Sequence, residues 1–339
     1  MADAVPLTVL TGFLGAGKTT LLNYLVRQPE MAGTAVLVNE FGEIGLDHIL
    51  VDRVADDAIL LPSGCLCCAV KGDLVRALRD LLPRVQAREI KRVVVETTGL
   101  ADPAPIVQTL LGDVSVALRY RLDGIVTVVD AVHAMGQFDE HAEAVRQVAM
   151  ADRIVLSKTD LAKTDLAHDN AALLTRLRTL NPAAPVIVAR RGVVDPAAIL
   201  ECGLFDAAGK IGDVRKWLDE AAFAGVPGKG SNRHDGSIHS FCLTFTEPLH
   251  WQGIGTCLEM LIGTRGESLL RVKGILNLVG QTRPVAIHGV QHMFHEPVLL
   301  EAWPEGDPRT SRIVFITRDL DRETIEAGLR AFEAAATGP

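Results

Sequence analysis

Short apolar runs alternate with amphipathic stretches along roughly the first two hundred residues of the chain. The runs are rich in Val, Ile and Leu and lie at residues 6–11, 34–38, 57–61, 91–96, 123–130, 152–157 and 184–189. Between several of them, stretches such as 74–85 and 173–180 place apolar residues at helical spacing. Strands that are apolar throughout and alternate with helices are typical of a mostly parallel sheet covered by helices on both faces. We therefore expect an α/β domain of this kind at residues 1–210.

A different pattern follows this region. Residues 225–237 are rich in Gly, Ser and charge and almost free of apolar residues, which is typical of a linker. Beyond it, the pattern predicts strands at 239–245, 269–280, 283–289 and 312–316, and helices at 251–262 and 321–335. This order predicts a linker at 211–236 and a smaller C-terminal α+β domain at 237–339.

Composition excludes several classes of protein. The net charge is −8 and no long Lys/Arg run is present, which argues against nucleic-acid and anionic-membrane partners. No apolar run reaches the length of about eighteen residues that a membrane-spanning helix needs. The first residues lack the basic flank of a signal peptide, and the 6 cysteines are unevenly spaced. We therefore expect a cytoplasmic protein with reduced thiols.

A phosphate-binding motif lies directly after the first predicted strand. Gly12 and Gly17-Lys18-Thr19 have the spacing of the P-loop, and an apolar-periodic helix follows them. Glycines let the backbone N–H groups surround phosphate oxygens, Lys18 supplies a charge for the β and γ phosphates, and Thr19 supplies a hydroxyl for Mg²⁺. The expected nucleotide-binding residues of this loop are Gly12, Gly15, Ala16, Gly17, Lys18, Thr19 and Thr20.

A second motif indicates which base is bound. The predicted strand at 152–157 ends in Ser157-Lys158-Thr159-Asp160, where GTPases carry Asn-Lys-x-Asp. A carboxylate at Asp160 accepts two hydrogen bonds from guanine that adenine cannot donate. Ser157 replaces the Asn that often ties this loop to the P-loop, and the Lys158 stem can lie along the base. We expect guanine selection by Asp160, with Ser157 and Lys158 beside it.

An acid for Mg²⁺ is expected at Glu96, where the run at 91–96 ends. P-loop proteins place an acid here that holds Mg²⁺, usually through water. Glu96 could instead activate the attacking water, and the sequence does not separate these two roles. Gly99 follows, where a backbone N–H approaches the γ-phosphate. Asp130 is a rival acid, ranked lower because no such glycine segment follows it.

With these residues the chain resembles the CobW family of P-loop GTPases over nearly its whole length. The matching motifs are TGFLGAGKTTLL (11–22), VNEFGEIGLD (38–47), SGCLCC (63–68), VVVETTGLADP (93–103), VVDAVHA (128–134), SKTD (157–160), LLRVKGIL (269–276) and HGVQHMF (288–294). The resemblance implies slow GTP hydrolysis with Mg²⁺, coupled to binding a divalent metal and delivering it to a client protein that requires the metal. It identifies neither the client nor the member of the family, and a homodimer is compatible with it.

The three clustered cysteines are the candidate cargo site. Cys65, Cys67 and Cys68 lie on a loop after an apolar strand, and three thiolates would fill three corners of a tetrahedral Zn²⁺ site. Thiolates also suit Cu(I) and disfavour Mg²⁺ and Ca²⁺, and Co²⁺ or another divalent metal could take the place of Zn²⁺. A redox pair and inert buried cysteines are the alternatives. Three thiols without a nearby fourth suit a metal that must be passed on.

The fourth ligand is open between water, a partner protein and an acid of the segment 38–47. Glu40 and Glu43 lie in this segment, where the γ-phosphate of GTP is expected to be sensed. The resemblance favours Glu43 as a zinc ligand, and a solvated loop is the alternative for both glutamates. We hypothesise that GTP orders residues 39–47 against the cysteine loop and that hydrolysis releases this segment, which alters the metal affinity.

Other features of the sequence give weaker evidence of function. His288, His292 and His295 suggest a second metal site, but a strand would place His288 and His292 on one face and His295 on the other. The remaining cysteines, Cys202, Cys242 and Cys257, lie singly in apolar patterns and are expected in the core. Alternative functions are a nucleotide-dependent scaffold for a cofactor enzyme, a redox switch and a P-loop kinase.

Overall fold

The computed structural model describes residues 4–39, 59–63, 70–161, 166–200, 202, 237–303 and 306–337. The chain forms two compact units, one of residues 1–174 with 184–204 and the other of residues 175–183 with 205–339. The three clustered cysteines and both switch glutamates, Glu40 and Glu43, lie outside the described residues.

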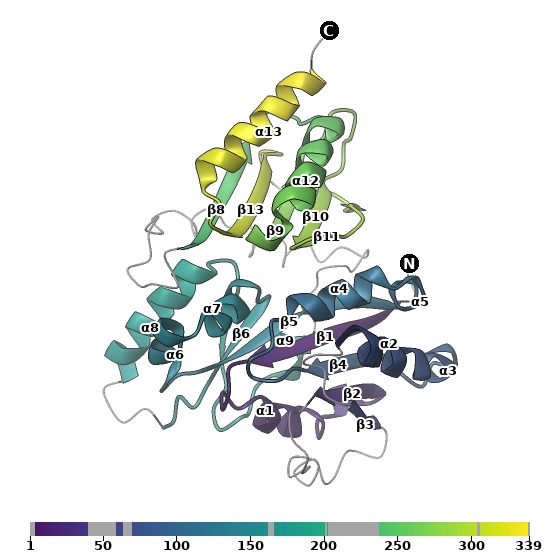
Figure 1. The fold of residues 1–339 in the computed structure, drawn as a ribbon, viewed down its shortest axis with the longest axis vertical. Helices are drawn as coiled ribbons and strands as arrows, with labels where there is room; N and C mark the ends of the chain where they lie inside the picture. Colours follow the sequence, from purple (N-terminus) through teal and green to yellow (C-terminus); the bar gives the residue numbers. More distant parts are fainter. Residues whose placement is uncertain are drawn as a thin grey trace. The chain divides into compact units, whose positions relative to one another are not determined.

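The first unit is built on a parallel sheet of seven described strands. Its strands are β1 (Val5–Gly12), β2 (Thr34–Asn39), β3 (Ile59–Ser63), β4 (Arg92–Glu96), β5 (Tyr120–Asp130), β6 (Arg153–Ser157) and β7 (Val186–Val188), in the order β3-β2-β4-β1-β5-β6-β7 (Figure 1). Every pairing in this sheet is parallel. The predicted α/β class is confirmed, and each apolar run corresponds to one strand within a few residues.

Helices cover both faces of this sheet. They are α1 (Lys18–Leu25), α2 (Val70–Asp80), α3 (Leu82–Gln86), α4 (Ala104–Gly112), α5 (Val114–Ala117), α6 (Ala134–Glu140), α7 (Ala142–Ala149), α8 (Leu166–Leu180) and α9 (Pro196–Leu200), with a 3-10 turn at Pro29–Met31. Leu21, Leu22 and Leu25 of α1 and Ile199 of α9 pack in one cluster with Leu10 of the central strand. Figure 1 shows α1 on one side of the sheet and α4 on the other.

The strand pattern follows from this double coverage. Positions along β1 are buried almost without interruption, because the helices of both layers remove both of its faces from water. Parallel strands also bring their carboxyl ends to one edge of the sheet. The ends of β1, β4, β5 and β6 therefore present the loops with the predicted nucleotide residues on the same side.

One expected helix is divided. The stretch 74–85 was expected to be a single helix, but α2 ends at Asp80 and α3 begins at Leu82, with Pro83 in its first turn. Proline lacks an N–H and its ring clashes with the preceding helical turn, so it suits a helix start rather than a helix interior. Pro83 therefore explains the break, although the apolar periodicity continues through it.

The second unit is an antiparallel sheet with two helices on one face. Its elements are β8 (Ile238–Phe245), α12 (Trp251–Arg265), a 3-10 turn at Gly266–Ser268, β9 (Leu269–Leu276), β10 (Val285–Val290), β11 (Met293–Phe294), β12 (Val298–Leu299), β13 (Ser311–Arg318) and α13 (Arg322–Ala336). The sheet order is β11-β10-β9-β13-β8, with β12 paired to β10, and Figure 1 shows α12 and α13 side by side against it. A core of Phe241, Ile254, Val272, Phe315 and Leu329 joins the sheet to the helices. The predicted C-terminal α+β fold is confirmed.

The expected placing of the three histidines on this sheet is wrong. His288 and His295 lie together, with ring centroids 5.0 Å apart, while His292 Nδ1 lies 3.2 Å from the Ile262 carbonyl oxygen. The chain reverses after β10, so that Gly289 pairs with Phe294 and His295 N donates to His288 O at 3.0 Å. Residues opposite one another in an antiparallel pair share a face, whereas the prediction assumed one continuous strand. The single cysteines Cys202, Cys242 and Cys257 are buried as expected.

Buried Asp123 gives the first unit a pH-dependent stability. Burial raises the pKa of the Asp123 carboxyl to about 6, against the lowering effects of Arg92, Arg121 and hydrogen bonds from Thr8 and the Cys202 backbone. A raised pKa means that the folded state binds the proton more tightly, so stability falls as pH rises from about 4 to 6.

Replacing Asp123 by asparagine is expected to stabilise the protein at pH 7.5 by up to about 3 kcal/mol and to have little effect at pH 4. The amide oxygen can accept from Cys202 N while the amide donates to the Thr8 hydroxyl, which now lies 3.1 Å from the carboxylate. Thermal melting of both proteins at the two pH values measures this. An equal shift in melting temperature at the two pH values would contradict the raised pKa of Asp123.

Candidate nucleotide site

The loop between β1 and α1 is a ring of residues 12–18 that turns at three glycines. Gly12, Gly15 and Gly17 have φ of 144°, 71° and 96°, in the region that favours glycine. A side chain at Gly12 would overlap the Val128 carbonyl oxygen of the neighbouring strand. The ring ends at the N-terminus of α1, where Gly17 is the N-cap, so the dipole of α1 reinforces the N–H groups. Such a loop suits a phosphate group.

Lys18 crosses this loop. Its Nζ donates to the Gly12 and Phe13 carbonyl oxygens at 2.8 and 3.3 Å, and the side chain is buried. Burial lowers the pKa of the Lys18 amine, and the nearby Glu96 carboxylate opposes that lowering. The amine is therefore buried within the loop and bonded to two of its carbonyl oxygens.

Thr19 and Glu96 form the predicted metal-side pair. Thr19 Oγ1 donates to Glu96 Oε1 at 3.0 Å, and Glu96 is buried at the end of β4, opposite Leu10 of β1. A hydroxyl and a carboxylate are hard oxygen ligands of the kind that Mg²⁺ takes together with phosphate. These two residues fit the role of Mg²⁺ ligands, and Lys18 lies beside them.

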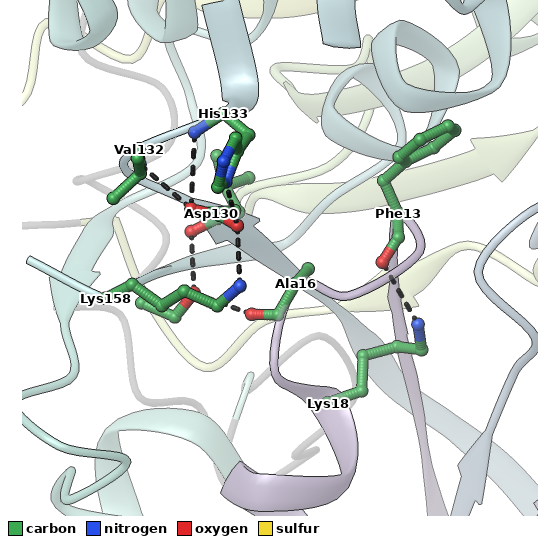
Figure 2. A network of polar contacts seen from close by, with 9 residues as sticks. Phe13, Ala16, Lys18, Asp130, Val132, His133 and Lys158 are labelled. Atoms are coloured by element: carbon green, nitrogen blue, oxygen red, sulfur yellow. Dashed lines mark hydrogen bonds and ion pairs between the residues drawn. The ribbon is translucent and has the colours of Figure 1, made fainter. Parts of the chain in front are cut away.

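Asp130 lies at the end of the neighbouring strand and has a different environment. It accepts from Lys158 Nζ at 2.7 Å, lies 2.9 Å from His133 Nδ1, and accepts from Val132 N at 2.9 Å (Figure 2). Desolvation opposes the fall, but the bonds from Lys158 and His133 hold the pKa of Asp130 below its ordinary value. Asp130 is thus engaged by Lys158, His133 and the backbone of Val132, whereas Glu96 is the acid bonded to Thr19.

Ser157 ties the expected guanine loop to the phosphate loop. Its hydroxyl donates to the Ala16 carbonyl oxygen at 2.6 Å and lies 3.1 Å from Val129 O. Lys158 follows with φ of 56°, and Leu161 N donates back to Lys158 O at 3.1 Å. The resulting turn leaves the Asp160 side chain exposed to solvent, where it can meet a base. Ser157 therefore joins the loop after β6 to the phosphate loop through its hydroxyl.

The loop after β4 lies against the phosphate loop. Thr97 N donates to Leu10 O at 2.9 Å, and a side chain at Gly99 would come within 2.6 Å of the Leu14 Cα. Gly99 is therefore required for this close approach. Gln147 of α7 donates to the Gly99 and Ala101 carbonyl oxygens at 3.1 and 2.9 Å.

The structure thus brings the predicted residues of the phosphate loop, the metal-side pair and the guanine loop to one edge of the sheet. Sequence reasoning missed His133 and Gln147. The second had a signal, because Gln147 is a polar residue on an otherwise apolar side of the stretch 144–151. Thr20 is exposed on α1, and its part in nucleotide binding stays a prediction. Among the described residues, no cluster of three or more His, Cys, Asp or Glu could hold a metal.

Comparisons with known proteins find matches in both units of the chain. The model of the CobW/HypB/UreG nucleotide-binding domain matches residues 6–188, and that of the cobalamin synthesis protein cobW C-terminal domain matches residues 238–333. The zinc chaperone YjiA of Escherichia coli is 35% identical over 97% of this chain and 99% of its own. The zinc-regulated GTPase metalloprotein activator 1 of Saccharomyces cerevisiae is 27% identical over 96% of this chain and 83% of its own.

A solved structure matches as well. The crystal structure of Zn(II)-bound YjiA GTPase from Escherichia coli superposes with a TM-score of 0.72 at 30% identity, covering 97% of this chain and 99% of that one. In the part of the chain that the structure describes, no helix combines the length and apolar character needed to cross a membrane.

Proposed function

The chain belongs to the CobW/HypB/UreG family, and from that premise we propose that it is a GTP-hydrolysing metallochaperone. It binds a divalent metal, Zn²⁺ or a related ion such as Co²⁺, at Cys65, Cys67 and Cys68, with Glu43 as a further ligand. It delivers this metal to a client enzyme. The names of two relatives support the proposal: a zinc chaperone matched over 99% of its length and a zinc-regulated GTPase metalloprotein activator matched over 83% of its length.

The nucleotide chemistry follows from the residues at the sheet edge. The phosphates of GTP would lie in the ring Gly12–Lys18, with Mg²⁺ held by Thr19 and Glu96 and the base selected by Asp160. When bound, Mg²⁺ neutralises charge on the β and γ phosphates. Lys18 supplies a second positive charge to the same oxygens. Because Glu96 Oε1 already accepts the Thr19 hydroxyl at 3.0 Å, we assign Glu96 to the metal rather than to the attacking water.

The observation that carries the coupling between GTP and metal is the register of three neighbouring strands. Asn39 at the end of β2 pairs with Ser63 at the end of β3, and Val38 pairs with Glu96 of β4. Residues 40–47 continue the chain from the end of β2, beside the strand that ends in Glu96, and residues 64–68 continue it from the end of β3, one strand further along the sheet. This order of strand ends supports a coupling between the γ-phosphate and both segments.

Replacing Cys65, Cys67 and Cys68 together by serine is expected to remove bound zinc while GDP binding persists, because hydroxyls are far weaker zinc ligands than thiolates. Metal analysis of protein purified under reducing conditions should give about one zinc per chain for the unaltered protein and near none for the variant. Competition titration should also give different zinc affinities with a GTP analogue and with GDP.

The matched control is Cys257→Ala. Burial raises the pKa of the Cys257 thiol to about 11, so this residue stays protonated and should not hold metal. Its variant should therefore keep its zinc. Equal zinc in the triple variant and the unaltered protein would overturn the cysteine site and leave a scaffold without metal transfer as the better account. Equal affinities in the two nucleotide states would overturn the coupling.

A further inference from the structure

Helix α7 holds the loop after β4 through one buried side chain. Gln147 is 1% exposed, and its Nε2 donates to Gly99 O at 3.1 Å and to Ala101 O at 2.9 Å. Both partners are carbonyl oxygens, which only accept, so only the amide nitrogen fits between them. The carboxamide therefore uses both of its hydrogens on this one turn of the chain.

These bonds fix successive peptide planes. Thr98 O accepts from Ala101 N at 3.1 Å and from the Thr97 hydroxyl at 3.1 Å, which orients the peptide that carries the Gly99 N–H. Gln147 orients the next peptide through Gly99 O. Because each peptide is planar, a bond to the carbonyl sets the direction of the N–H in the same plane. The Gly99 N–H and its neighbour are thus oriented by contacts within the protein itself.

Helix α7 is itself anchored on both sides of this loop. The Thr127 hydroxyl of β5 donates to the Gln147 carbonyl oxygen at 2.7 Å, and Arg146 Nη1 lies 3.3 Å from Asp102 Oδ2. At the start of α7, the His141 ring stacks on Phe13 of the phosphate loop with centroids 4.7 Å apart. The helix that carries the Gln147 carboxamide is therefore held in place by contacts with β5 and with the phosphate loop.

We propose that Gln147 is a positioning residue for the γ-phosphate: by holding the Gly99 and Ala101 carbonyl oxygens it keeps the turn at 98–101 in the conformation in which the Gly99 N–H, on the preceding peptide, meets GTP but has no partner on GDP. This inference rests on the proposed GTPase function. A donor fixed before binding needs no rearrangement when charge develops on the γ-phosphate oxygens. Gln147 touches no nucleotide and acts only through Gly99.

The test is Gln147→Met, which keeps the length of the side chain and removes both donors. The rate of GTP hydrolysis in a single turnover should fall about tenfold, because a displaced N–H stabilises the transition state less well. The ratio of GTP-analogue affinity to GDP affinity, measured with fluorescent nucleotides, should fall about fivefold, with GDP affinity itself changed by less than about twofold.

Thr127→Val is the matched control, because it removes a buried hydrogen bond from the same helix while keeping the carboxamide. It should lower the melting temperature as Gln147→Met does, yet keep the affinity ratio. A Gln147→Met protein that keeps the ratio, whether its affinities for GDP and the GTP analogue are unchanged or fall together, would overturn the proposal. If the unaltered protein binds GTP without hydrolysing it, the proposed function fails, and the affinity ratio alone decides the role of Gln147.

Discussion

Replacing Lys18 by methionine is expected to lower GTP turnover by about 10³-fold, the size of loss seen when a pre-placed charge is removed from a transition state. The amine lies within the phosphate loop, 2.8 Å from Gly12 O, and no other described cation is bonded to these carbonyls. Methionine fills similar space but offers no charge to the β and γ phosphates. Phosphate release under saturating GTP measures the loss.

Folding should survive this change, which separates chemistry from stability. Burial lowers the pKa of Lys18, so the folded state disfavours the charged amine, and removing that charge offsets the hydrogen bonds lost to the two carbonyls. The melting temperature should stay within about 5 °C of that of the unaltered protein. Turnover within about tenfold of the unaltered enzyme would contradict the role given to Lys18.

Replacing Gly12 by alanine is expected to destabilise the first unit by about 3 kcal/mol or more, the range of strained backbone and core clashes. Two effects combine at this position. The φ of 144° is outside the regions that a side chain tolerates, and the added Cβ would overlap the Val128 carbonyl oxygen on β5. That oxygen belongs to a neighbouring strand of the sheet, so neither partner can shift without breaking the pairing of β1 and β5.

Gly15→Ala is the matched control in the same loop. Its φ is 71°, but an added Cβ meets nothing within 4 Å, so only the backbone preference of about 1 kcal/mol is lost. Urea unfolding of both variants measures the difference in stability, as a shift of the unfolding midpoint with an unchanged slope. Equal losses of stability in the two variants would show that the positive φ alone causes the destabilisation. They would contradict the proposed clash with the Val128 carbonyl oxygen.

The fold could be predicted from sequence where its signal is local. Each apolar run of the first unit became a strand because a strand buried on both faces needs continuous Val, Ile and Leu, as in the stretch 91–96. The break between α2 and α3 and the pairing of His288 with His295 were not predicted. The first depends on one proline inside a periodic pattern, and the second on where the chain reverses after β10.

The candidate site likewise has a part that the sequence predicts and a part that it does not. The sequence by itself determined the phosphate loop and its order, since Gly12 to Thr19 are consecutive and their chemistry is carried by spacing along one strand–loop–helix unit. It also named Glu96 and Asp160 as the acids to examine.

Only the tertiary structure decided which of these residues hold one another. Ser157 reaches Ala16 across 141 positions, Thr19 reaches Glu96 across 77, and Gln147 reaches Gly99 across 48. No periodicity along the chain encodes such pairs. They arise because parallel strands gather their carboxyl ends at one edge of the sheet, where side chains distant in sequence come within hydrogen-bond distance.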